Sequence, residues 1–322
     1  MNYMNKESPI PLVVIRCTVF NHEPFLIETL EGFVMQKTNF PFIAIVHDDA
    51  SMDGSAAIIR EYEKKYPHII KPIYQTANQW SKRDGSLYRA MEKAIPEGVK
   101  YEAICEGDDC WTNPNKLQMQ VDYLEQHPEC VLCHTDYLVS TTRKHVKQKH
   151  YDDEPYFGPG HIHSYHICTL TVLYRREAYM KSPKHKLNHP EWKMGDDPLW
   201  IELSQFGKFH YIDVVTGKYR LLPDSASHST DVKKQIAFWE SYNEITEFYS
   251  KLYGYPYQEP TKHSLYLSIM RQCYDNGDKK TAKRYWIQAK EENAINLRSF
   301  LFYFCNVYNT RWIIKLLYKL RS

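Results

Sequence analysis

The stretch "FIAIVHDDASMDGSAAII", residues 42–59, changes from the pattern of a strand to the pattern of a helix. Its first five residues are apolar, which predicts a buried β-strand at 42–46. Ile58, Ile59 and Tyr62 then follow at helical spacing and predict a helix. The residues between them, "HDDASMDGS" at 47–55, therefore form an acidic loop directly after the carboxyl end of a strand.

The alternation of strand and helix continues on both sides of this stretch. Residues 12–16 predict a strand, and Asn21 or His22 caps the helix that follows it. The pattern further predicts helices at 84–94 and 114–127, and strands at 101–105, 130–135 and 170–174. Such alternation indicates a mostly parallel α/β sheet with right-handed crossovers.

The pattern loosens after residue 140. Residues 143–166 are polar and histidine-rich, which predicts a loop, whereas "GDDPLWIELSQFG" at 195–207 predicts a short helix. Thr216-Gly217 is interpreted as the turn of a hairpin. From about residue 231 onward the chain has helical segments without strand signals, so we expect a domain boundary near residue 230.

The composition excludes some partners and compartments. With 41 basic and 39 acidic residues the formal net charge is +2, which argues against nucleic acid as a partner. The eight cysteines lie mostly in apolar runs of a chain too large to need disulfides, so we expect reduced thiols. Residues 1–17 lack the pattern of a signal peptide. The expectation is a cytoplasmic protein.

Three polar clusters each follow a predicted strand: Thr18–Asn21, Asp48–Asp53 and Glu106–Asp109. Because ligands bind beyond the carboxyl ends of strands in such sheets, we expect the clusters to line one crevice. The carboxylates of Glu106, Asp108 and Asp109 repel one another unless a cation lies among them, and carboxylate oxygens select Mg²⁺ or Mn²⁺. The alternative is that Asp109–Asn113 is an acidic loop before the N-terminus of a helix that starts at Pro114.

Four motifs together resemble those of family 2 glycosyltransferases with the GT-A fold. They are "TVFN" (18–21), "HDDASMDGS" (47–55), "EGDDCWTNPNKL" (106–117) and "GDDPLW" (195–200), and they occur in the family's order and approximate spacing. The resemblance covers residues 10–225. It implies a Rossmann-like mixed sheet in a catalytic domain at 1–230, with a nucleotide-sugar part at 10–140 and an acceptor part at 141–230. Residues 231–322 are then a helical extension.

The resemblance also implies roles for single residues. Thr18 and Phe20 match positions near the nucleobase, and Asn21 beside them is a candidate for binding the nucleotide. Asp49 matches the aspartate that binds the base's polar edge, and Asp48, Ser51 and Asp53 complete that loop. Asp108 and Asp109 match the aspartates at the ribose and the metal-bound diphosphate. Glu106 departs from the family pattern, in which aspartate is usual. Arg83, Arg89 and the pair Tyr219-Arg220 are candidates for the phosphates, and His228 is a candidate for the metal or the diphosphate.

The motif "GDDPLW" resembles the family's acceptor-side acid motif. The alignment favours Asp196 as the general base that deprotonates the acceptor hydroxyl. Gly195 replaces the usual glutamate, so Asp197 is also a candidate. The alternative is that Asp196 only caps the helix.

These roles imply an inverting transferase that moves a sugar from a nucleoside diphosphate to a hydroxyl of a glycan or lipid-linked acceptor. The family commonly uses UDP-linked donors. The resemblance further implies a role in polysaccharide biosynthesis of the bacterial cell envelope. One rival is a sugar-phosphate nucleotidyltransferase, but "RCTVFNHEP" at 16–24 lacks the glycines of its phosphate loop. The other is an inactive nucleotide- or glycan-binding module, against which the intact Asp108, Asp109 and Asp196 count.

The C-terminal segment has a basic amphipathic pattern. Arg311, Lys315 and Lys319 fall on one helical face, and Trp312, Ile313 and Leu316 on the other. This pattern is typical of a helix that contacts the inner face of the membrane, but it also fits a helix packed on the protein.

Overall fold

The computed structural model describes residues 9–140, 145–148, 156–157, 167–222, 231–255, 262–275, 277–295 and 297–307. The chain forms two compact units. The first contains the described residues up to Glu191 and Gly195–Leu221, and the second contains Trp192–Met194 and the described residues from Leu222 onward. The predicted motifs other than His228 and the C-terminal segment lie in the first unit, since residues 223–230 and 308–322 are outside the described residues.

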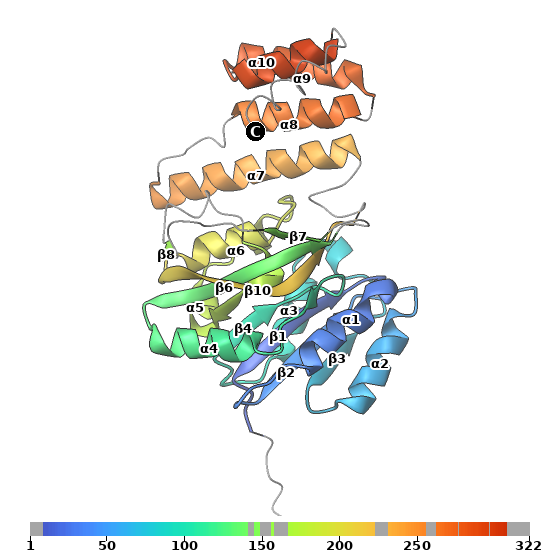
Figure 1. Cartoon of the computed structure of the whole chain (residues 1–322), viewed down its shortest axis with the longest axis vertical. Helices are drawn as coiled ribbons and strands as arrows, with labels where there is room; N and C mark the ends of the chain where they lie inside the picture. Colours follow the sequence, from blue (N-terminus) through green and yellow to red (C-terminus); the bar gives the residue numbers. More distant parts are fainter. Residues whose placement is uncertain are drawn as a thin grey trace, which may run out of the picture. The chain divides into compact units, whose positions relative to one another are not determined.

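The first unit is built on one mixed sheet with the strand order β3-β2-β1-β4-β9-β6-β10-β5 (Figure 1). β3 (Ile70–Tyr74), β2 (Phe42–Asp48), β1 (Val13–Val19) and β4 (Tyr101–Ile104) are parallel. β9 (Leu173–Arg175) is antiparallel to both β4 and β6 (Cys130–Ser140), and β10 (Lys208–Arg220) is parallel to β6. β5 (Cys110–Trp111), β7 (His145–Gln148) and β8 (Tyr156–Phe157) are short antiparallel additions. The predicted mixed, mostly parallel α/β sheet is confirmed.

Helices cover both faces of this sheet (Figure 1). α1 (Glu23–Val34), α2 (Ser55–Lys65) and α4 (Lys116–Gln126) pack on one face, where Leu30 and Leu117 share a buried cluster with Ile15. α3 (Ser86–Ala94) packs on the other face, where Met91 shares a second cluster with Val14. Val14 and Ile15 are consecutive in β1, and consecutive side chains of a strand point to opposite faces.

Short elements complete the first unit. α5 (Arg176–Lys181) and α6 (Asp196–Leu203) are short helices, and the 3₁₀-helices are η1 (Trp80–Lys82), η3 (Thr169–Thr171) and η4 (His185–Asn188). The predicted helix at 195–207 is thus confirmed as α6. The predicted strand at 170–174 begins later, because η3 occupies Thr169–Thr171 before β9 starts.

The predicted hairpin at Thr216-Gly217 is wrong. β10 runs without a turn through Gly217, which pairs with Trp111 of β5 on one side and Tyr137 of β6 on the other. A Cβ atom on Gly217 would lie 2.2 Å from Leu170 Cδ1 and 3.0 Å from the Cys110 carbonyl oxygen. The glycine is therefore needed for the close approach of neighbouring chains and not for a turn.

The described part of the second unit is helical. It contains α7 (Val232–Tyr253), α8 (Lys262–Asp275), α9 (Lys279–Glu291) and α10 (Leu297–Val307). Met270 and Cys273 of α8 share a buried cluster with Ala282 and Tyr285 of α9. None of the described helices is long and apolar enough to cross a bilayer.

The first unit also buries a lysine, Lys116, at the start of α4. Its Nζ donates hydrogen bonds to Gln120 Oε1 at 2.5 Å and to the Val172 carbonyl oxygen at 3.4 Å. The Nζ also lies 4.5 Å from the centre of the Trp111 ring. Burial lowers the pKa of Lys116 to about 7, because the charged form loses its hydration.

This lysine predicts a pH dependence of stability. An unfolded lysine titrates at about 10.4, so between pH 7 and 10 the unfolded chain binds more protons than the folded chain. We expect Lys116 alone to raise the free energy of unfolding by up to about 1.4 kcal/mol per pH unit in this window. Urea unfolding of the wild type and of Lys116→Met at pH 7, 8 and 9 measures the difference. Equal slopes in the two proteins would contradict the prediction.

Candidate active site

The three polar clusters predicted from the sequence lie side by side at the carboxyl ends of β2, β1 and β4. The Asp49 N–H donates to the Val19 carbonyl oxygen at 2.8 Å, and the Gly107 N–H donates to the Thr18 carbonyl oxygen at 2.9 Å. The register of the parallel strands brings this about, since Val19 pairs with Asp48. The strand ends thus form one continuous polar edge.

The first two clusters are joined by reciprocal hydrogen bonds. The Asn21 N–H donates to Ser51 Oγ at 2.9 Å, and the Met52 N–H donates back to Asn21 Oδ1 at 2.8 Å. Asp53 accepts from the Glu23 N–H at 3.0 Å and from the Ser55 N–H at 3.0 Å. Asn21, Ser51 and Asp53, predicted to bind the nucleotide, therefore each hold the loop to the start of α1. Their contact with a nucleotide stays a prediction.

The buried Asp49 holds the chain that follows β3. Its Oδ1 accepts from the Gln79 N–H at 2.6 Å, and its Oδ2 accepts from the Trp80 N–H at 3.0 Å. The neighbouring Asp48 is also buried and accepts from the Ser51 N–H at 3.3 Å. The predicted base-binding aspartate thus fixes the position of Trp80, which the sequence analysis did not single out. Phe20 lies exposed at the same edge.

The carboxylates after β4 differ in their partners. Glu106 Oε2 accepts from Thr169 Oγ1 at 2.9 Å, and Asp109 Oδ1 accepts from the Arg220 N–H at 2.8 Å. Asp108 is half-buried, and its carboxylate has no hydrogen-bond donor among the described residues. The alternative that Asp109 belongs to a helix cap is wrong, since β5 follows Asp109 and α4 begins at Lys116.

Crowding and burial make this cluster unfavourable for negative charge. Burial, followed by the charge of Asp108, raises the pKa of Glu106 to about 7. The same two causes raise the pKa of Asp109 well above its ordinary value. Burial also lowers the pKa of His22, against the opposing charge of Asp108. A bound cation would relieve this repulsion.

The donor set fits a hard divalent cation that is held jointly with a substrate. The described residues contain no group of three or more histidine, cysteine, aspartate or glutamate side chains placed to hold a metal. Mg²⁺ commonly binds through one or two carboxylates and completes its coordination with substrate phosphates. Asp108, whose carboxylate accepts no hydrogen bond from the described part of the chain, and Asp109 beside it match that arrangement. The predicted ligand His228 lies outside the described residues.

The predicted phosphate-binding arginines lie in different surroundings. Arg220 is held against the carboxylates, because its guanidinium donates to the Asp108 carbonyl oxygen and pairs with Glu28. Arg89 instead donates to the Asp84 carbonyl oxygen at 2.7 Å. Arg83 lies over the Trp80 ring, 5.9 Å from its centre. Arg220 is therefore the arginine that the structure places at the acidic cluster.

The acceptor-side acids begin α6. The N-cap residue of α6 is Gly195, and no side chain accepts a cap hydrogen bond there, so the alternative that Asp196 caps this helix is wrong. The charge of Asp196 contributes to the raised pKa values of Glu106 and Tyr88, which places it within electrostatic reach of both. Asp197 has its pKa raised by burial and by Asp196. Asp196 is thus close enough to the acidic cluster for its charge to act on Glu106.

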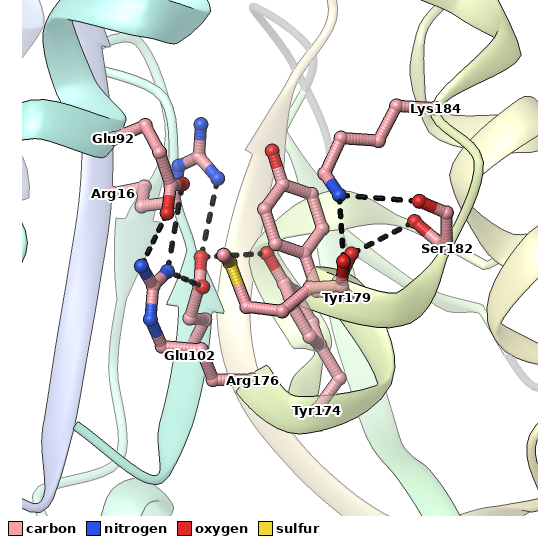
Figure 2. A network of polar contacts seen from close by, with 9 residues as sticks. Arg16, Glu92, Glu102, Tyr174, Arg176, Tyr179, Ser182 and Lys184 are labelled. Carbon is pink, nitrogen blue, oxygen red and sulfur yellow. Dashed lines mark hydrogen bonds and ion pairs between the residues drawn. The ribbon is translucent and has the colours of Figure 1, made fainter. Parts of the chain in front are cut away.

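A buried ionic network lies beneath the strand ends (Figure 2). Glu102 of β4 is fully buried and accepts from Arg16 of β1 at 3.1 Å and from the Tyr174 hydroxyl at 3.0 Å. Arg176 pairs with both Glu102 and Glu92 of α3. The network therefore ties β1, β4, α3 and α5 together within a few residues of Thr18 and Glu106.

Comparison with known proteins agrees with this geometry. The family model of glycosyl transferase family 2 matches residues 15–182. An uncharacterized protein of Mycobacterium tuberculosis is 40% identical over 35% of this chain and 32% of its own length. That match thus spans about a third of this curated relative. The putative teichuronic acid biosynthesis glycosyltransferase TuaG of Bacillus subtilis is 25% identical over 73% of this chain and 88% of its own length.

Solved structures show the same fold. S. aureus TarS 1-349 in complex with UDP-GlcNAc has a TM-score of 0.57 at 16% identity, covering 89% of this chain and 82% of that chain. The mannosyltransferase PcManGT from Pyrobaculum calidifontis, in complex with GDP-Man and Mn²⁺, has a TM-score of 0.52 at 14% identity, covering 96% of this chain and 88% of that chain. The resemblance drawn from the four motifs is confirmed: the chain belongs to glycosyl transferase family 2, a family of glycosyltransferase enzymes.

Proposed function

We propose that this protein transfers a sugar, with inversion, from a UDP-linked donor to a hydroxyl of a glycan or lipid-linked acceptor of the bacterial envelope. The carrying observation is that Asp196 lies within electrostatic reach of Glu106, at the edge that also holds Asp108 and Asp109. TarS with UDP-GlcNAc and PcManGT with GDP-Man support a nucleotide sugar as donor, and TuaG supports an envelope glycan.

In this proposal the chain's own groups divide the work. Asp108 and Asp109 would hold a divalent cation, Mn²⁺ or Mg²⁺, which supplies charge neutralisation at the diphosphate when bound. Arg220 adds a fixed positive charge beside them. Asp196 accepts the proton of the acceptor hydroxyl as the new C–O bond forms on the face of the sugar opposite the leaving diphosphate. A single displacement of this kind inverts the anomeric centre.

Calorimetric titration of UDP with and without Mn²⁺, followed by incubation with a panel of sugar nucleotides, tests the proposal. We expect metal-dependent UDP binding and slow release of sugar from one donor. Pyrophosphate release from a nucleoside triphosphate and a sugar phosphate would support a nucleotidyltransferase instead. Tight binding without turnover of any donor would support an inactive module.

Asp108→Asn is expected to weaken the binding of UDP in the presence of Mn²⁺ by about tenfold or more, since it removes a charged metal ligand. Binding of UDP without metal should change little. Asp122→Asn, at an exposed position of α4, is the matched control and should bind as the wild type does. An equal loss of UDP affinity with and without Mn²⁺ would contradict the assignment of Asp108 to the metal.

A further inference from the structure

A small, open hollow lies in the first unit between η1, α3 and η4. Its lining includes Trp80, Arg83, Tyr88 and Lys186. Trp80 is 42% exposed, and its ring centre lies 6.4 Å from that of Tyr88. Exposed aromatic rings beside polar groups are suited to the apolar face of a sugar ring. We call this site the Trp80 hollow.

The Trp80 hollow adjoins the proposed base. Tyr88 lines it, and a Cβ atom on Gly195, the residue before Asp196, would lie 2.8 Å from the Tyr88 hydroxyl oxygen. The charge of Asp196 also acts on Tyr88. The phenol ring is thus shared between the hollow and the N-terminus of α6. Tyr88 therefore separates the hollow from the start of α6, where the proposed base lies.

The charges around the hollow favour an anion. The guanidinium of Arg83 lies over Trp80, and no carboxylate of the described residues pairs with it. Lys186 adds a second cation, with its Nζ donating to the His189 carbonyl oxygen at 3.1 Å and Glu191 within electrostatic reach. Asp84, the nearest acid in sequence to Arg83, lies beside Arg89. Among the described residues, Arg83 is thus a cation without a paired carboxylate at the rim of an aromatic surface.

We propose that the Trp80 hollow binds an anionic sugar ring of the acceptor, one that carries a carboxylate or a phosphate ester. The ring packs on Trp80, and its charge lies at Arg83. This inference rests on the proposed transferase function and adds the chemical class of its acceptor. The position of Trp80 supports it, because Asp49 holds the backbone N–H of Trp80 and so keeps the aromatic surface in place.

Saturation-transfer NMR with three small probes tests this site in the full chain. The probes are methyl β-D-glucuronide, glucose 1-phosphate and methyl β-D-glucoside. We expect saturable binding of at least one anionic probe, about fivefold stronger than that of the neutral glucoside, as one exposed ion pair allows. Binding of the glucuronide alone identifies a uronic acid as the acceptor class, and binding of the phosphate alone identifies a phosphorylated sugar.

Variants of the hollow locate this binding. Trp80→Ala should lower the affinity for the anionic probe by about 3- to 10-fold, whereas Trp80→Phe should retain most of that affinity. Arg83→Gln should remove the preference for the charged probes. UDP binding with Mn²⁺ should be unchanged in Trp80→Ala and Trp80→Phe. Equal binding of charged and neutral probes, binding of none, or a loss of UDP affinity in Trp80→Ala would each overturn the proposal. Failure of the wild type to bind UDP would instead contradict the transferase function.

Discussion

Replacing Asp196 by asparagine is expected to lower kcat by about 10²- to 10⁴-fold, the usual contribution of a general base. Asparagine keeps the shape of the side chain but cannot take the proton of the acceptor hydroxyl. Binding of UDP with Mn²⁺ should stay within about twofold of the wild type, because the donor's diphosphate is assigned to Asp108 and Asp109. Transfer assays and calorimetric titration of the same preparations measure the two effects.

Asp197→Asn is the comparison that makes this test specific. Asp197 is adjacent in the sequence and belongs to the same first turn of α6. Of the two acids, it is Asp196 whose charge contributes, after burial and nearer groups, to the raised pKa values of Glu106 and Tyr88. We expect the loss of kcat in Asp197→Asn to be at least tenfold smaller. A larger loss in Asp197→Asn than in Asp196→Asn would make Asp197 the base.

Glu102→Gln is expected to destabilise the folded chain by about 3 to 5 kcal/mol, because breaking a buried ion pair leaves an uncompensated charge. Glu102 is fully buried, and its carboxylate pairs with both Arg16 and Arg176. Neither arginine can lose its proton near neutral pH, so both would stay charged without this partner. Urea unfolding followed by tryptophan fluorescence measures the change.

Glu177→Gln is the matched control for that variant. Its partner is Lys181, four residues along α5, and the two side chains are 75% and 59% exposed. Removing this pair should change the free energy of unfolding by less than about 1 kcal/mol. Similar values for Glu102→Gln and Glu177→Gln would show that the network of Figure 2 contributes no more than a surface pair does.

Much of the sheet was predictable because its parallel strands are short, buried and apolar. The strands predicted at 12–16, 42–46, 101–105 and 130–135, and the helices between them, follow from periodicity alone. β3 was missed because "IKPIY" is only partly buried and contains Pro72, which is tolerated at the sheet edge. β5 was missed because two residues carry no periodicity. The turn predicted at Gly217 was wrong because the local sequence looks the same for a glycine in a turn and for a glycine that lets a neighbouring chain segment approach closely.

The sequence predicted where the candidate site lies in the sheet, but not most of the hydrogen bonds between its residues. The rule that ligands bind beyond strand ends places Thr18, Asp48 and Glu106 at one edge. It does not reveal that Ser51 and Asp53 are bonded to the start of α1, or that Asp49 holds Trp80. Those bonds join residues about thirty positions apart, and no local pattern encodes them. Trp80 carried only one signal, a tryptophan in a polar loop.

The placement of β9 has a consequence for recombining this fold with that of its relatives. In this three-residue strand, Tyr174 pairs with Glu102 of β4 on one side and with Leu132 of β6 on the other. β9 therefore joins the strands β3-β2-β1-β4 to the strands β6-β10-β5. Arg175 strengthens this connection between β4 and β6, since its side chain donates to the Cys130 carbonyl oxygen at 2.8 Å and to the Tyr101 hydroxyl at 3.2 Å. A chimaera in which β6 and β10 come from a relative should therefore also take β9 and β4 from that relative, so that the paired strands still match. Otherwise β4, β9 and β6 should all be kept from this chain.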